Sequence, residues 1–592
     1  MCGIAGVMTS TGAVASDRVL DILTKALAHR GPDGQGRYIA RGIALVQTRL
    51  AIIDLKTGDQ PIFEGRPNDG SAALIANGEI YNYVELTAAL DGVELSTRSD
   101  CEPPLHLYRR HGLDFASHLR GMYAIAIHDP EAGRLVLSRD PFGIKPLYYV
   151  ERGTYFAFAS EPQALIAAGL ADRSLLASAR DEVLQLQFST GRDTPFEHIK
   201  RVLPGETLVV SEGRIVERRR LAALPNGAPE RLDEATALER LDEALSDTVT
   251  CHQRADVPYG MFLSGGIDSS ALLALMARLN DRPVRAYTAG FPETNVHDER
   301  DHARAVARSV GADHVEVEVK EEDFWRDLPA IAAAVDDPCA DYAIVPSFAL
   351  ARAAARDVKV VLCGEGGDEI LAGYGRYRST LRPTWLGGRT MRARGIFDGL
   401  DILREASTGW RDGIVAAQAM AVSTGRSRLQ VAQATDCADW LPNDLLTKLD
   451  RCLMAHGLEG RTPFLDRPFA EFAFRLPDSL KSRRRRGKWL LRKWLSVHMP
   501  DAEPFQRKRG FTVPAAEWIA RQGRRLGPLV AAQPGVAGLT RPGAVEVLYS
   551  RTGKRPGFAA WSLLFFALWH SVHILGRAPE GDTFEFLSQA AN

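Results

Sequence analysis

The sequence has few cysteines, and their spacing does not suggest a zinc site or a disulfide framework. Seven cysteines are spread over 592 residues, and the closest two, Cys437 and Cys452, are 15 positions apart. CxxC pairs, which mark zinc ribbons and redox motifs, are therefore missing. A sparse, odd set of cysteines is typical of proteins in a reducing compartment, so we expect a cytoplasmic location.

The sequence also lacks an excess of charge and a long hydrophobic run. Lys and Arg total 73 against 74 Asp and Glu, so no basic field would attract nucleic acid or an anionic membrane. The most apolar stretch, residues 558–569, is shorter than the about 20 residues that span a bilayer, so we expect a buried helix there. No basic region precedes Arg18, so we expect no signal peptide.

Two textures divide the chain. Residues 2–205 contain short apolar runs broken by Gly, Pro, Asn and Asp, which predicts packed strands with a few helices. A stretch rich in Pro, Gly and Arg follows, at about residues 203–231, and marks a domain boundary. Beyond it, strand-like runs alternate with helical ones, and residues from about 378 onward are mostly helical, which predicts a parallel α/β sheet with extra helices. We therefore expect domains at 2–205 and 206–592.

The N-terminus carries a candidate nucleophile. Cys2 becomes the first residue if Met1 is removed. Its free α-amino group, with an ordinary pKa of about 7.7–8.0, could then accept the thiol proton. Position alone does not distinguish this role from an incidental cysteine near a chain end, so the neighbouring motifs decide.

Five motifs follow in order: His29-Arg30-Gly31-Pro32-Asp33, Arg49-Leu50-Ala51-Ile52-Ile53-Asp54, Asn77-Gly78-Glu79-Ile80-Tyr81-Asn82, Ser99-Asp100-Cys101-Glu102 and Arg139-Asp140-Pro141-Phe142-Gly143. With Cys2, they resemble the class II, N-terminal-nucleophile glutamine amidotransferases over about residues 2–165. The resemblance implies a four-layer αββα sandwich.

The same resemblance implies a role for each residue of this site. Cys2 would attack the glutamine side-chain amide, and Asn77 with the Gly78 N–H would form the oxyanion hole. Arg49 would bind the substrate carboxylate. The implied glutamine-binding set is Arg49, Leu50, Ala51, Ile52, Ile53, Asn77, Gly78, Glu79 and Asp100, with Glu79 and Asp100 holding the α-ammonium. Surface ion pairs at Arg49 and Asp100, and a plain hairpin turn at residues 77–78, are the alternatives.

A second site begins at residues 263–270, Leu-Ser-Gly-Gly-Ile-Asp-Ser-Ser, between an apolar strand and a helix. Small residues before a helix N-terminus allow backbone N–H groups to approach a phosphate. The loop resembles that of the N-type ATP pyrophosphatases, which cleave ATP between its α and β phosphates. The resemblance implies ATP binding by Leu263, Ser264, Gly265, Gly266, Asp268, Ser269, Ser270, Ala289, Cys363 and Gly364.

The segment 363–369, Cys-Gly-Glu-Gly-Gly-Asp-Glu, completes this second site. Hard oxygen ligands suit Mg²⁺, and the resemblance implies that Asp268 and Asp368 bind it. It also implies catalytic roles for Glu365 and Lys488. Further matches lie at residues 458–466, 488–492 and 507–511; in these, Arg461 and Arg492 are weaker candidates, for which a structural role is the alternative.

Both halves together resemble the glutamine-dependent asparagine synthetases. The resemblance implies that glutamine is hydrolysed at Cys2, that MgATP activates aspartate, and that ammonia crosses an internal passage to displace AMP; a homodimer is expected from the family alone. Cys363, Gly457, Gly460 and Ala289-Gly290 depart from the usual family pattern around the pocket. Two alternatives stay open: another carboxylate acceptor, such as a sugar acid, peptide or specialised metabolite, and a regulatory protein without activity.

Overall fold

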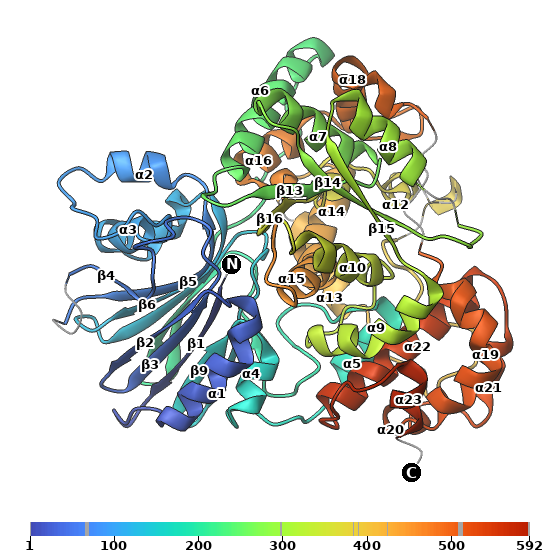
Figure 1. The fold of residues 1–592 in the computed structure, drawn as a ribbon, viewed down its shortest axis with the longest axis horizontal. Coiled ribbons are helices and arrows are strands. Elements are labelled where there is room, and N and C mark those ends of the chain that lie inside the picture. The colour runs from blue at the N-terminus through green and yellow to red at the C-terminus, as the bar shows by residue number, and fades with distance from the viewer. Residues whose placement is uncertain are drawn as a thin grey trace.

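The computed structural model describes residues 2–65, 70–296, 299–382, 384–386, 388, 390–422, 424–506 and 513–589. A strand-rich N-terminal part lies beside a larger C-terminal part that contains most of the helices (Figure 1). The motif at residues 507–511 lies outside the described residues.

The N-terminal part is built on two six-stranded antiparallel sheets. Its strands are β1 (Gly3–Thr9), β2 (Gly34–Ala40), β3 (Ile43–Arg49), β4 (Ile62–Phe63), β5 (Ala73–Ile80), β6 (Gly121–Asp129), β7 (Arg134–Arg139), β8 (Tyr148–Arg152), β9 (Tyr155–Ala159), β10 (Lys200–Arg201), β11 (Glu206–Ser211) and β12 (Arg214–Arg220). One sheet has the order β10-β8-β9-β1-β3-β2 and the other β12-β11-β7-β6-β5-β4.

The two sheets pack face to face between outer helices. Side chains alternate along each strand, so Ile4 of β1 lies between the sheets whereas Ala5 packs in the core formed with the outer helices. Helices α1 (Asp17–Leu27) and α4 (Pro162–Ala167) cover the first sheet, and α3 (Pro103–His111) covers the second. This arrangement is the predicted αββα sandwich.

The second sheet continues past the expected domain boundary at residue 205. Strand β11 pairs with β7, and β12 pairs with β11. Because β12 is rich in arginine and largely exposed, it lacks the apolar alternation by which a strand is recognised. We therefore place the end of the N-terminal part at Arg220.

The C-terminal part contains a parallel five-stranded sheet, as the alternation of strands and helices predicts. Its strands are β13 (Tyr259–Phe262), β14 (Arg285–Gly290), β15 (Asp313–Glu318), β16 (Val360–Leu362) and β17 (Glu459–Arg461). They follow the order β15-β14-β13-β16-β17, so the strand order reverses between β13 and β16. In such sheets, ligands bind outside the carboxyl ends of the strands at this reversal.

Helices surround this sheet and form most of the remaining regular structure described in the C-terminal part. The Asp233 side chain caps the helix that follows it, accepting hydrogen bonds from two backbone N–H groups. The principal helices are α6 (Glu234–His252), α7 (Ile267–Leu279), α8 (Arg300–Ser309), α9 (Glu321–Ala334), α10 (Ile344–Ala354), α15 (Thr447–Met454), α16 (Arg467–Arg475), α18 (Trp489–His498), α19 (Ala515–Ala531) and α22 (Lys554–His573).

The apolar stretch at residues 558–569 forms part of α22. Its side chains are buried, including Trp561 and Trp569, which confirms the expected buried helix. Within the ranges that the structure describes, none of the helices combines the length and apolarity needed to cross a membrane.

Candidate functional site

Cys2 lies just before β1 and is almost fully buried, at 7 % exposure. Its backbone N–H donates to Oδ1 of Asn77 over 3.1 Å, which links the first sheet to β5 of the second. Burial raises the pKa of the Cys2 thiol. A thiol in such surroundings needs a base to reach its nucleophilic form.

Asn77 is fully buried beside Cys2. The bond from the Cys2 N–H fixes the orientation of the Asn77 side-chain amide. The Nδ2 donor of this amide has no hydrogen-bond partner among the described residues. Leaving a buried donor unpaired costs about 1–3 kcal/mol, so it calls for an explanation, such as a bound group. At Gly78, a Cβ would come within 2.1 Å of the Met122 carbonyl oxygen, so β6 excludes any side chain there.

Two buried carboxyl groups, those of Glu79 and Asp100, lie near this amide. Burial raises the pKa of Asp100 to about 6, even though its carboxylate accepts the Ile80 N–H over 2.8 Å. Burial and the Asp100 charge raise the pKa of Glu79 as well. Arg461 of β17 lies 3.4 Å from Oε1 of Glu79, so the C-terminal part contributes a cation here. A pair of buried acids suits a substrate ammonium.

Arg49 ends β3 at the edge of the same region. Its Nη1 lies 2.7 Å from Oδ1 of the exposed Asp59, and its Nη2 donates to the Asp54 carbonyl oxygen over 2.5 Å. The following segment, residues 50–53, packs against Val360 and Met454 of the C-terminal part. The structure thus places Asn77 against Cys2, and it packs residues 50–53 and Glu79 against the C-terminal part.

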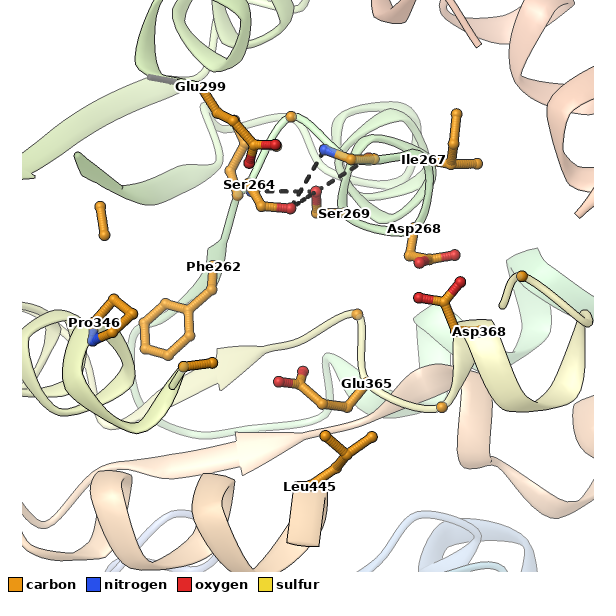
Figure 2. A pocket seen from close by; sticks show the side chains of 18 of the residues that line it. Phe262, Ser264, Ile267, Asp268, Ser269, Glu299, Pro346, Glu365, Asp368 and Leu445 are labelled. Atoms are coloured by element: carbon orange, nitrogen blue, oxygen red, sulfur yellow. Dashed lines mark hydrogen bonds between the residues drawn. The ribbon is translucent and has the colours of Figure 1, made fainter. Parts of the chain in front are cut away.

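The second site is a cavity of about 510 Å³ at the reversal of the parallel sheet. The loop from β13 to α7 forms one edge (Figure 2). There Ser264 Oγ accepts the Gly266 N–H over 3.3 Å and lies 3.1 Å from Ser269 Oγ. Gly265 has a φ of +67°, which favours glycine.

Most of the residues predicted for ATP binding line this cavity. They are Leu263, Ser264, Gly265, Gly266, Asp268, Ser269, Ala289 and Gly364, together with Glu365, Asp368 and Lys488. Ser270 and Cys363 are absent from the lining. Ser270 points into the protein from α7, and the Cys363 thiol lies 3.8 Å from the Val361 carbonyl oxygen.

Asp268 and Asp368 lie side by side at one end of the cavity (Figure 2). Lys488 pairs with both: its Nζ lies 2.6 Å from Oδ1 of Asp368 and also contacts Oδ2 of Asp268. Burial alone would lower the pKa of Lys488, but the two carboxylates raise it. At Gly373, a Cβ would fall 1.7 Å from Oδ1 of Asp368, so glycine is required for this approach.

The opposite end has an apolar wall, and Phe262 and Pro346 lie there in Figure 2. Such a wall suits a flat base.

Among the described residues, no cluster of three or more His, Cys, Asp or Glu side chains could hold a metal.

Several residues that line the cavity lie outside all of the sequence motifs named above. Lys448 of α15 is 3.2 Å from Oδ2 of Asp341, and Tyr374 donates to Glu369 over 2.7 Å. Burial raises the pKa of Glu365, an effect that Lys448 opposes. Arg492, a weak candidate from the sequence, also lines the cavity. Lys448 and Asp341 are isolated in the sequence and meet only in the fold, so no local pattern could identify them.

Both halves of the chain are similar to known proteins. The asparagine synthase family model matches residues 240–571, and the glutamine amidotransferase domain model matches residues 1–220. Glutamine-hydrolysing asparagine synthetase 1 of Bacillus subtilis is 30 % identical, with 98 % of each chain covered. Asparagine synthetase 2 of that organism is 29 % identical over 84 % of this chain and 70 % of its own. Amidase chry2 of Gibberella zeae is 32 % identical over 64 % of this chain and 60 % of its own.

Proposed function

The chain belongs to the glutamine-hydrolysing asparagine synthetase family, and from this premise we propose that it transfers the amide nitrogen of glutamine to the side-chain carboxylate of aspartate. ATP is cleaved to AMP and pyrophosphate in the process. The observation that carries the proposal is the pairing, in one chain, of a buried Cys2–Asn77 site with a cavity that presents Lys488 between two aspartates.

At the first site, the Cys2 thiol attacks the glutamine side-chain carbonyl once removal of Met1 frees the α-amine to take the thiol proton. The unpaired Nδ2 of Asn77 supplies a preorganised donor for the resulting oxyanion. Collapse of this intermediate releases ammonia and leaves a thioester on Cys2. Water then hydrolyses the thioester to glutamate. Glu79 and Asp100 hold the substrate ammonium, and Arg49 binds its carboxylate.

At the second site, the loop from Ser264 to Ser269 binds the ATP phosphates through backbone N–H groups at the start of α7. Two adjacent hard carboxylates that already attract a cation fit Mg²⁺. Asp268 and Asp368 would hold this ion, which neutralises phosphate charge. Lys488 adds a fixed positive charge where negative charge develops.

The acceptor end favours a zwitterionic amino acid. Lys448 offers a cation for a carboxylate, while Asp341 and Glu365 offer carboxyl groups for an ammonium. A sugar acid carries no ammonium, so Lys448, which already pairs with Asp341, would have to serve both acids and the substrate carboxylate. This balance of charge supports aspartate over a carboxylic acid that carries no ammonium group.

The contact between Arg461 and Glu79 supports direct delivery of ammonia, because it brings the glutaminase site against the C-terminal part. A cytoplasmic location and a homodimer remain predictions from the sequence.

The acceptor is tested by supplying ammonium chloride and MgATP with a panel of carboxylates and measuring AMP and pyrophosphate. We expect stoichiometric AMP with aspartate and background levels with glutamate, a hexuronic acid and a short acidic peptide. AMP with another acceptor, and none with aspartate, would contradict the assignment while preserving the reaction class. No AMP with any acceptor would favour the regulatory alternative.

A further inference from the structure

We propose that Asp450, on α15 of the C-terminal part, is a positioning residue for Cys2 and acts through Arg30. The inference rests on the proposed function of Cys2 and adds a residue that the ATP-dependent half contributes to glutamine hydrolysis. Asp450 contacts no reacting atom. It holds the Arg30 guanidinium, which in turn holds the backbone of Cys2.

The first link joins Arg30 to Cys2. Nε of Arg30 donates to the Cys2 carbonyl oxygen over 3.2 Å, and the guanidinium is fully buried. Together with the bond from the Cys2 N–H to Asn77, this contact fixes the nucleophile on both sides of its Cα. Any rotation of the Cys2 backbone would break one of the two bonds.

The second link joins Arg30 to Asp450, 420 positions away in the sequence. Nη1 donates to Oδ2 over 2.8 Å and Nη2 donates to Oδ1 over 2.9 Å, so the pair is bidentate. This geometry fixes the plane of the guanidinium as well as its charge. Burial alone would raise the pKa of Asp450, but Arg30 holds it below the usual value, so the carboxylate is ionised.

The surrounding network leaves Asp450 little freedom. Nη1 of Arg451 donates to Oδ2 of Asp450 over 2.9 Å, and Nε of Arg451 donates to Asp336 over 2.7 Å. On the other side, Arg30 also donates to Glu161 over 2.7 Å. Removing one buried partner from such a network is costly because it leaves an uncompensated charge, so Arg30 would reorient toward Glu161.

Helix α15 has a place in both sites. Lys448, two positions before Asp450, lines the ATP cavity. A single rigid helix therefore carries one side chain of the synthetase cavity and the anchor of the glutaminase nucleophile. The N-terminal part alone offers Arg30 the Cys2 carbonyl oxygen and Glu161, and the C-terminal part adds the bidentate contact with Asp450.

The test is Asp450→Asn in the full chain, assayed by glutamate release at saturating glutamine. The asparagine amide keeps the shape but turns one acceptor into a donor that faces Arg30. We expect glutaminase kcat to fall, by up to about 100-fold for a displacement of about 1 Å, while KM for glutamine changes less than threefold. Inactivation of Cys2 by a diazoketone analogue of glutamine, followed by intact mass, should slow to the same extent.

The matched control is Asp466→Asn. Asp466 also forms a buried bidentate bridge across the two halves, to Arg120, but this bridge does not touch Cys2. We expect this variant to retain wild-type glutaminase kcat. Thermal melting of both variants distinguishes unfolding of the protein from a displacement of Arg30 and Cys2 within the folded protein. Asp450→Glu, which restores the charge, should recover part of the glutaminase kcat.

Two results would overturn the inference. One is a wild-type kcat and labelling rate in a folded Asp450→Asn protein. The other is an equal loss in Asp466→Asn, which would mean that contact between the two halves, rather than Arg30, matters. If the wild-type chain released no glutamate, the proposed function of Cys2 would fail with it; a normal wild type with an unaffected variant overturns this inference alone.

Discussion

Nζ of Lys488 lies 2.6 Å from Oδ1 of Asp368, and it also contacts Asp268, so one buried ammonium bridges two carboxylates at the end of the ATP cavity. Lys488 precedes α18 with a φ of +57°, an uncommon backbone conformation for a side chain other than glycine. Strain of this kind is tolerated where the surroundings require it. The arrangement ties the position of the cation to that of the two acids.

Replacing Lys488 with methionine should separate the two activities. Lys488→Met removes the fixed cation, and we expect AMP formation to fall about 100- to 1,000-fold, as for loss of a preorganised electrostatic group. Glutamate release from glutamine should stay within about twofold of wild type. Lys493→Met, on the same helix but outside the cavity lining, is the control. Unchanged AMP formation in Lys488→Met would remove this residue from the reaction.

The nucleophile is tested by Cys2→Ala. We expect glutamine-dependent asparagine formation to be lost, because no other thiol lies before β1 to act as the nucleophile. Ammonia-dependent asparagine formation, which takes place at the separate cavity, should be fully retained. Cys251→Ala, which alters another buried cysteine on α6, should change neither. Parallel loss of both activities in Cys2→Ala, measured by asparagine yield, would undermine the separation of the two sites.

Asn77→Ala tests the unpaired amide. Its Nδ2 has no partner among the described residues, so the folded protein loses no hydrogen bond at this atom, whereas the oxyanion loses a donor; the bond from the Cys2 N–H to Oδ1 is lost as well. Glutaminase kcat should drop about 100- to 1,000-fold. Asn82→Ala, a half-buried asparagine of the same motif whose Nδ2 donates to the His118 carbonyl oxygen, serves as control. A kcat within threefold of wild type for Asn77→Ala would exclude the oxyanion role.

Glutamine binding should weaken in acid. Burial raises the pKa of Asp100 to about 6, and only its carboxylate form attracts the substrate ammonium. Lowering the pH through 6 protonates Asp100, so we expect KM for glutamine to rise between pH 7 and pH 5. The KM for ammonium, corrected for free ammonia, should not show this step. A glutamine KM that stays flat down to pH 5 would contradict the role of Asp100.

The sequence pattern was sufficient to predict packed strands in the N-terminal part and a parallel sheet in the C-terminal part, because strand-like runs and turns are local signals. The sandwich and most of the cavity residues came from the resemblance to known families. The sequence was insufficient at β12, where the arginine-rich strand at the sheet edge has no apolar face to reveal it. It also assigned Ser270 and Cys363 to ATP binding by their place in a motif. The direction of each side chain, which depends on packing against α7 and β16, excludes both from the cavity lining.

Residues that act across the two halves could not be predicted. Arg30 belongs to a recognised motif, but its partner Asp450 lies in a helix whose sequence gives no sign of the contact. Lys448 and Asp341 pose the same problem inside the cavity. Such pairs form only where two domains pack together, and this packing produces no periodic pattern in the sequence of either segment.

The central claim is that one chain moves nitrogen from Cys2 to the ATP cavity without releasing it. Amide-¹⁵N glutamine, aspartate, MgATP and a tenfold excess of unlabelled ammonium over glutamine test it, with asparagine and AMP measured by mass spectrometry and chromatography. We expect asparagine that is mostly ¹⁵N-labelled, with one AMP formed per asparagine. Label diluted to the level of the bulk ammonium, or labelled ammonium with no amide product, would contradict it.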